Sequence, residues 1–176
     1  LIETSPVIID ATSGVSGAGR EADLAYSFCE TDESFKPYGV VGHRHSSEIA
    51  EQCSFLKGDK VTISFTPHLA PFKRGMLASI YCRPSALFGQ VSTDSVREVL
   101  EKHYESEKFV RVLPKGVMPD VKNVNGSNYI DITGVYDEDT GFIKLFSAQD
   151  NLGKGAALQA IQACNVMFGL PEDAGL

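Results

Sequence analysis

Hydrophobic and polar residues alternate along several short stretches of the chain, as they do in half-buried β-strands. The alternation is most regular in KVTISFT at residues 60–66, and other short runs are rich in Val, Ile, Phe and Tyr. The stretches that we expect to form strands are residues 6–10, 38–42, 60–66, 76–83, 109–113, 129–136 and 142–148. The polar sequence DEDTG joins the last two stretches and predicts a hairpin turn.

Three further stretches place apolar residues every three or four positions, which predicts amphipathic helices. They cover residues 49–56, 93–104 and 155–168. Ser46 or Ser47 is expected to cap the first helix, with Glu48 in its first turn, where a carboxylate suits the helix dipole. Because strands and helices do not strictly alternate, we expect an α+β fold, with a mostly antiparallel mixed sheet covered by helices, rather than a doubly wound parallel sheet.

The composition limits the class of protein. The 176 residues are 43% hydrophobic and 22% charged, which fits one globular domain over residues 1–176. A formal net charge of −7 argues against a dedicated nucleic-acid binder, which needs a basic face, and no apolar run reaches membrane-spanning length. We therefore expect no nucleic-acid or membrane partner and a cytoplasmic location.

The cysteine spacing indicates no metal or redox motif. Cys29, Cys53, Cys82 and Cys164 include no CxxC pair and no zinc-finger spacing. Two disulfides could form from them, but a domain of this size can be stabilised by its core alone. We therefore expect four reduced thiols, in the core or on the surface.

The segment VGHRHSSEI concentrates titrating and charged groups. In an extended chain, His43 and His45 would share one face while Arg44 points away. The pair could hold zinc with Glu48 or His68 as a third ligand, lie in a solvated surface loop, or act as a general acid or base. For the last interpretation, the positive end of a helix dipole disfavours protonation of a histidine and Glu48 favours it, which could hold a pKa near neutrality.

Two other segments could bind anions. The loop SGVSGAGR at residues 13–20 has three glycines, which let backbone N–H groups approach an anion closely, and Arg20 could clamp a phosphate or carboxylate. The glycine spacing matches neither the dinucleotide fingerprint nor a Walker loop, and a tight turn explains it equally well. The segment DNLGKG at residues 150–155 could likewise be a polar helix cap or an anion-binding helix start.

Taken together, these segments resemble one family, the N-acetyl-gamma-glutamyl-phosphate reductases of arginine biosynthesis. The segments that carry the resemblance are SGVSGAGR at 13–20, YGVVGHRH at 38–45, FTPHL at 65–69, RG at 74–75, FVRVLPKG at 109–116, GSN at 126–128, DNLGKGAALQAIQ at 150–162 and MFGLPE at 167–172. Ser47 departs from the proline that usually precedes the glutamate of HRHxPE in the family. The resemblance implies a fold like the carboxy-terminal domain of glyceraldehyde-3-phosphate dehydrogenase.

The resemblance also implies a reaction. In this family a cysteine thiolate attacks the acyl phosphate of N-acetylglutamyl 5-phosphate, phosphate leaves, and NADPH transfers hydride to the thioester to give N-acetylglutamate 5-semialdehyde. The family's nucleophilic cysteine and amino-terminal nucleotide-binding domain precede the SGVSGAGR loop, and neither occurs in these 176 residues. We therefore expect the chain to be the carboxy-terminal catalytic and dimerisation domain of an NADP-dependent enzyme, homo-oligomeric and inactive alone.

By motif position, the resemblance implies roles for individual residues. His45 would be the acid or base, with His43 close by, Glu48 orienting it and Tyr38 lining the pocket. The residues expected to bind substrate are Arg20 and Arg44, and those expected near the cofactor are Ser16, Gly17, Gly19, Asn151 and Lys154. His68 is expected to be structural. The competing hypotheses are a non-catalytic binding or oligomerisation module and a histidine-ligated metalloprotein.

Overall fold

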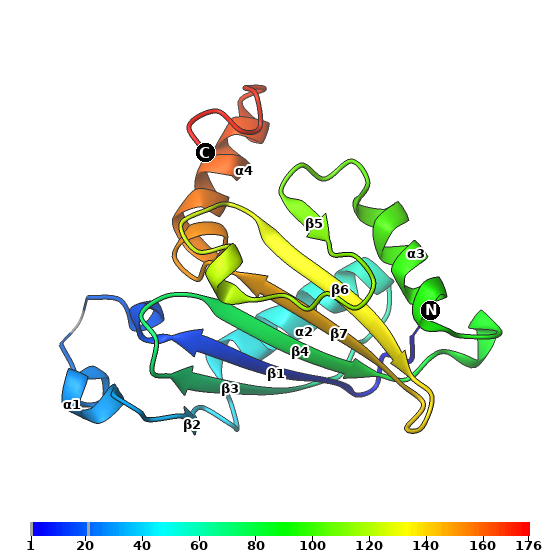
Figure 1. Cartoon of the computed structure of the whole chain (residues 1–176), viewed down its shortest axis with the longest axis horizontal. Coiled ribbons are helices and arrows are strands. Elements are labelled where there is room, and N and C mark those ends of the chain that lie inside the picture. Colours follow the sequence, from blue (N-terminus) through cyan, green and yellow to red (C-terminus); the bar gives the residue numbers. More distant parts are fainter. Residues whose placement is uncertain (1, 21) are drawn as a thin grey trace.

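A single mixed sheet organises the protein (Figure 1). A computed structural model describes residues 2–20 and 22–176, and within them seven strands pair in the order β2-β3-β1-β4-β7-β6-β5. The strands are β1 (Val7–Gly14), β2 (Lys36–Pro37), β3 (Ile63–Ala70), β4 (Met76–Cys82), β5 (Val110–Val112), β6 (Ile130–Asp137) and β7 (Phe142–Gln149). Neighbouring strands are antiparallel except for the parallel pairs β1–β3 and β5–β6. The expected α+β fold with a mostly antiparallel mixed sheet is confirmed.

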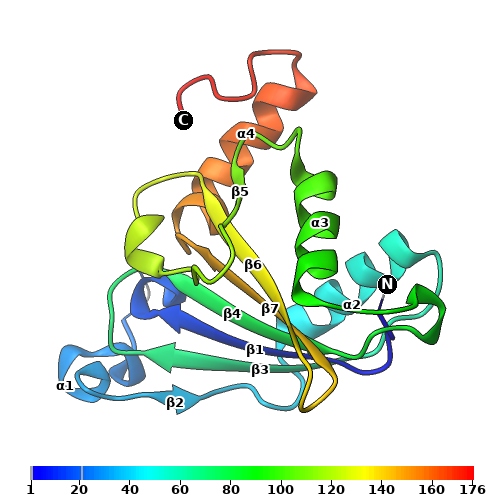
Figure 2. The same ribbon diagram turned by 45° about the vertical axis from the view of Figure 1, so that its right-hand side comes forward.

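Two helices cover one face of this sheet. The helices are α1 (Phe28–Thr31), α2 (Arg44–Lys57), α3 (Thr93–Tyr104) and α4 (Leu158–Met167), with short turns η1 (Val15–Ala18), η2 (Leu24–Tyr26), η3 (Ala86–Phe88), η4 (Val121–Asn123) and the π-helical η5 (Gly153–Ala157). The core joins Cys53 of α2 and Val96 of α3 to Val7 and Ile143 of the sheet. Because these four residues pack in one cluster, α2 and α3 lie on the same face. Figures 1 and 2 show α4 extending away from the sheet.

The expected strand at residues 38–42 is wrong. Pairing in this region is limited to β2, and the residues that follow it form a turn. Gly39 and Gly42 have φ angles of 53° and 79°, in the left-handed region that glycine tolerates and that a strand excludes. Val41 gave the segment part of its strand-like composition, yet it lies exposed in the turn.

The start of α2 also differs from expectation. His43, and not one of the two serines, caps the helix, because its Nδ1 accepts a hydrogen bond from the backbone N–H of His45 at 3.2 Å. The helix begins at Arg44, so the HRH segment is not extended, and Glu48 lies beyond the first turn. The turn at Gly42 explains this, since it places the His43 ring at the helix mouth before either serine is reached.

The third strand continues further than its alternation predicted. β3 includes Pro67 and ends at Ala70, beyond the expected strand at residues 60–66. A proline cannot donate to a ladder, and it is tolerated here because the neighbouring β2 pairs with β3 over only two residues. As a result, Phe65, Pro67 and Leu69 point to one face of β3, and all three line the cavity described next.

Candidate active site

A cavity of about 780 Å³ lies at one end of the sheet. Its wall combines β1, β2 and β3 with the start of α2, the glycine loop after β1, and the segment leading into α4. Figure 1 shows α1 and β2 beside the same end of β1 and β3. The cavity therefore gathers the three segments that the sequence singled out as candidates for chemistry.

His43 is the structural centre of the histidine segment. Its ring packs edge-on against the rings of Tyr38, His45 and Phe65, at centroid distances of 5.4, 5.0 and 5.3 Å. Burial lowers the pKa of His43 below its ordinary value of 6.5, and the charges of His45 and Arg44 lower it further. The ring is therefore neutral at pH 7, as its role as hydrogen-bond acceptor at the helix cap requires.

His45 is the histidine available for chemistry. Its backbone is fixed at the first turn of α2 by the bond to His43, and its side chain lines the cavity. Among the described residues, no hydrogen bond engages its imidazole nitrogens. A ring that is held in place by its backbone and has both nitrogens free can exchange a proton with a bound molecule.

Two tyrosines lie close together at the cavity. Tyr38 is anchored by its backbone N–H, which donates to the carbonyl of Pro67 at 3.0 Å. Burial raises the pKa of Tyr38 above 10.0, Tyr26 raises it further, and Arg44 acts in the opposite direction. The Tyr38 hydroxyl therefore stays protonated at neutral pH and can donate a hydrogen bond to a ligand.

Two cations line the same cavity, Arg44 at the start of α2 and Lys36 in β2. Arg44 was expected at the site, whereas Lys36 and Tyr26 were missed. The signal for Lys36 was its position two residues before Tyr38, which puts both side chains on one face of an extended segment. Because the strand was expected to begin at residue 38, the common face of Lys36 and Tyr38 was not recognised.

The glycine loop is held in place by Asn151. The side-chain oxygen of Asn151 accepts a hydrogen bond from the Gly75 N–H at 2.8 Å, and its NH₂ group donates to the Ser16 hydroxyl at 3.0 Å. Asn151 lines the cavity but is only 6% exposed, so its side chain is used for positioning. Gly17 lines the cavity too, while Ser16 and Gly19 line a neighbouring groove.

Asp150 fastens the segment that leads into α4. Its carboxylate is 0% exposed and accepts hydrogen bonds from the backbone N–H groups of Gly126, Leu152 and Gly153 at 2.5, 2.9 and 2.9 Å, and from Arg74 Nε at 2.8 Å. Burial by itself would raise the pKa of Asp150, but these bonds outweigh it and hold the pKa below 3.8. The DNLGKG segment is therefore a polar cap in which the protein supplies its own anion.

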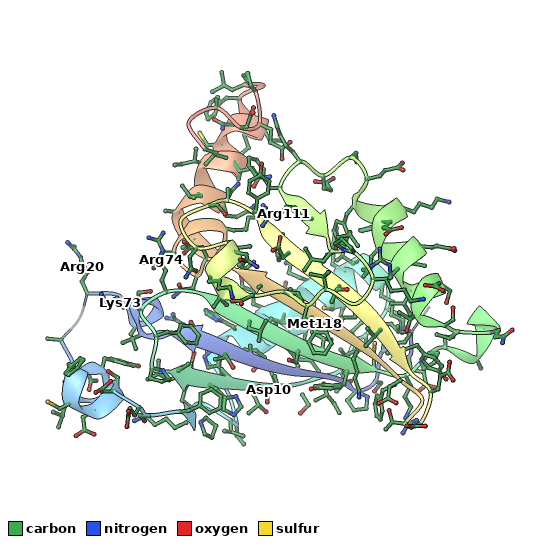
Figure 3. All side chains as sticks on the ribbon, viewed as in Figure 1. Asp10, Arg20, Lys73, Arg74, Arg111 and Met118 are labelled. Atoms are coloured by element: carbon green, nitrogen blue, oxygen red, sulfur yellow. The ribbon has the colours of Figure 1, made fainter. Side chains whose placement is uncertain are left out.

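Three further residues expected at the site line neither the cavity nor the neighbouring groove. Glu48 is exposed on α2, and Arg20 extends into solvent from the end of the glycine loop, as Figure 3 shows. Lys154 turns away from the cavity, and its Nζ donates to Gln162 Oε1 at 2.5 Å. Burial lowers the pKa of Lys154.

Neither metal ligands nor reactive cysteines gather at this site. Within residues 2–20 and 22–176, no group of three His, Cys, Asp or Glu side chains is placed to hold a metal ion. All four cysteines are free thiols, and none lines the cavity as far as the structure describes it. Cys82 is buried, and burial raises its pKa to about 11, so it is an unreactive core thiol.

Solved structures with the same architecture define the fold class. Aspartate semialdehyde dehydrogenase II from Vibrio cholerae superposes with a TM-score of 0.73 at 15% identity, over 95% of this chain and 56% of that chain. An aspartate semialdehyde dehydrogenase from Francisella tularensis superposes with a TM-score of 0.66 at 13% identity, over 93% and 58% of the two chains. At such identities the likeness establishes the fold alone, which is one found in semialdehyde dehydrogenases.

Sequence comparison gives the family. Residues 1–151 match the family model described as "Semialdehyde dehydrogenase, dimerisation domain", and the chain belongs to this family. Proteins named N-acetyl-gamma-glutamyl-phosphate reductase from Acetivibrio thermocellus and Lachnoclostridium phytofermentans are 52% and 51% identical over all 176 residues. A protein of the same name from Geobacter metallireducens is 49% identical. The chain spans 50% of the length of each of these relatives.

Proposed function

We propose that the chain provides the substrate-binding and proton-transfer half of an NADP-dependent N-acetyl-gamma-glutamyl-phosphate reductase. The observation that carries the proposal is His45, whose imidazole opens onto the cavity with both nitrogens free of hydrogen bonds to the described residues. The names of the relatives indicate the substrate, an N-acetylated glutamate activated as its phosphate. The nucleophilic cysteine and most of the nucleotide site would lie in the half of these relatives that the chain does not span.

In this reaction His45 holds and moves a proton. Its imidazole accepts the proton of the attacking thiol and passes it to the carbonyl oxygen as hydride adds to the thioester carbon. It takes the proton back when the C–S bond breaks to release the aldehyde and the thiolate. NADPH, when bound, supplies the hydride. The neutral His43 fixes the backbone of His45, while the Arg44 guanidinium and the Tyr38 hydroxyl would bind anionic or carbonyl oxygens of the substrate.

The part of this chain that would face the cofactor is uncharged. Gly17, Asn151, Leu152 and Gly155 line that side of the cavity, while the neighbouring cations Lys154 and Arg74 are bonded to Gln162 and Asp150. Small residues suit close approach to a flat neutral ring, whereas phosphates need cations or open helix ends. This favours contact with the nicotinamide end of NADP, with the phosphates bound elsewhere.

The surface of α4 indicates where the amino-terminal half that the relatives carry would bind. The polar Gln162 and Asn165 face the protein, whereas Met167 and Phe168 are 80% and 74% exposed. A surface helix normally has the reverse arrangement. An outward apolar face of this kind is typical of an interface.

We also propose that the chain forms homo-oligomers, as the description of its family as a dimerisation domain supports. No helix among the described residues is long and apolar enough to cross a membrane. For a biosynthetic reductase of this kind we propose a cytoplasmic location and participation in arginine biosynthesis.

The test is turnover by the complete gene product that contains this chain. It should reduce N-acetylglutamyl phosphate with NADPH, and His45→Ala should lower kcat by about 10²- to 10⁴-fold, the usual contribution of a general acid or base. His103→Ala is the matched control, because His103 lies on α3 outside the cavity, and it should leave kcat unchanged. Near-normal turnover of His45→Ala would remove His45 as the proton carrier. A complete protein that binds partners but lacks turnover would favour the non-catalytic module.

A further inference from the structure

The cavity carries positive charge that the protein does not neutralise. Lys36 and Arg44 both line it, and neither forms an ion pair or a side-chain hydrogen bond with the described residues. Asp23 is the one carboxylate at the wall among these residues. One of its oxygens accepts a hydrogen bond from the backbone N–H of Ala25 at 2.8 Å, and it forms no ion pair with either cation, so the wall keeps a net positive charge. Unpaired cations in a concave, partly apolar site favour an anionic ligand.

The strand register sets the distance between this charge and the histidines. Lys36 is paired with Leu69, Tyr38 is bonded to Pro67, and the His43 ring contacts Phe65, so the three cavity residues follow one another along β3. Phe65 and Leu69 are four residues apart, which is about 13 Å along a strand at roughly 3.3 Å per residue. The Lys36 backbone therefore lies at the end of this wall of the cavity opposite to the histidine pair.

We propose that Lys36 is a specificity-determining residue that binds the carboxylate of the substrate, at the end of the cavity remote from the reacting acyl carbon. The proposal rests on the proposed function, because a glutamyl phosphate has two anionic groups, the acyl phosphate and a carboxylate several bonds away. With Arg44 beside the histidines and Lys36 at the far end, the cavity has a cation for each. Arg20, the other candidate, lies outside the wall.

Steady-state kinetics of the complete gene product test the assignment. Lys36→Met keeps the length of the side chain and removes its charge, and it should raise KM for the acyl phosphate about 10- to 100-fold, the usual loss of a charge-assisted hydrogen bond, with little change in kcat. Lys36→Arg should restore most of the affinity. Arg20→Met removes one exposed cation outside the cavity and should leave KM unchanged. An unchanged KM in Lys36→Met, or an equal rise in Arg20→Met, would overturn the proposal.

A substrate analogue identifies the group that Lys36 binds. When the carboxylate is replaced by a carboxamide, KM of the parent enzyme should rise by the same factor as in Lys36→Met, and the variant should discriminate little between the two substrates. If instead the rise in KM caused by the variant and the rise caused by the carboxamide multiply when the two changes are combined, Lys36 does not bind the carboxylate.

Binding of N-acetylglutamate, measured by titration calorimetry, separates this proposal from the reaction itself. Lys36→Met should weaken that binding at least tenfold even if the parent shows no reductase turnover, an outcome that would reject the proposed function and retain the role of Lys36. A parent that turns over normally, together with a variant that binds N-acetylglutamate equally well, would retain the proposed function and reject the role of Lys36.

Discussion

Replacing Asp150 by asparagine should destabilise the chain strongly, although the two side chains have the same shape. The carboxylate is fully buried, and every group around it is a donor: Arg74 Nε and the backbone N–H groups of Gly126, Leu152 and Gly153. An asparagine has one acceptor oxygen and one NH₂ group. Whichever way the amide is turned, its NH₂ group opposes at least one N–H donor.

The less damaging orientation keeps the oxygen toward Leu152 and Gly153 and sets the NH₂ group against the Gly126 N–H. Leaving that donor unpaired costs about 1–3 kcal/mol, and the bond from Arg74 loses the negative charge of its acceptor, about 1 kcal/mol more. The Arg74 side chain is 42% exposed, so solvent screens part of this second loss. The expected destabilisation is therefore about 2–4 kcal/mol, a large fraction of the ~5–15 kcal/mol typical of a domain.

Urea unfolding of the 176-residue chain at pH 7, followed by circular dichroism, measures this difference. Asp139→Asn is the matched control, since Asp139 is exposed in the turn between β6 and β7 and its loss of charge should change the stability little. The pKa of Asp150 is lowered in the folded state, so its contribution is present above 3.8 and is lost as pH falls through the folded pKa. The difference in the free energy of unfolding between parent and variant should therefore narrow below pH 3.8. A variant within about 0.5 kcal/mol of the parent at pH 7 would refute the reasoning.

Two further predictions concern packing and the surface of α4. Gly134→Ala should destabilise the chain by about 1–3 kcal/mol in the same urea assay, because the added Cβ would lie 2.7 Å from Val96 and 2.8 Å from Leu145; an unchanged midpoint would contradict that packing. Cys164 is exposed on α4 and should react rapidly with a maleimide in the chain alone but slowly in the complete gene product, with Cys82 slow in both, since burial raises its pKa to about 11. Equal reactivity of Cys164 in the two proteins would count against the proposed docking of the amino-terminal half on α4.

The histidine segment was predictable because its residues are adjacent in the sequence. Because they are consecutive, these three residues, His43, Arg44 and His45, stay close to one another however the neighbouring elements pack. Which histidine is free was not predictable. An extended chain would have presented both rings equally, and only the turn at Gly42 made one of them a helix cap and left the other open.

The polar segments at residues 16–19 and 150–154 show the opposite case. Their composition suits anion binding, but the same donors and acceptors can equally satisfy one another. In the fold, Asn151 bonds to Ser16 and Asp150 collects the donors expected to meet a phosphate. Lys36 was overlooked for the complementary reason, since a lone lysine in an irregular stretch has no periodicity to mark it.

Local patterns in this sequence determined most strands, the three long helices α2, α3 and α4, and the titrating residues, because periodicity and capping act within a few positions of one another. The tertiary structure decided which polar groups are free. Whether a donor faces a ligand or another part of the chain depends on contacts between residues far apart in sequence, such as the bond joining Ser16 to Asn151. Contacts of this kind decide which residues position the site and which remain free to bind or react with a ligand.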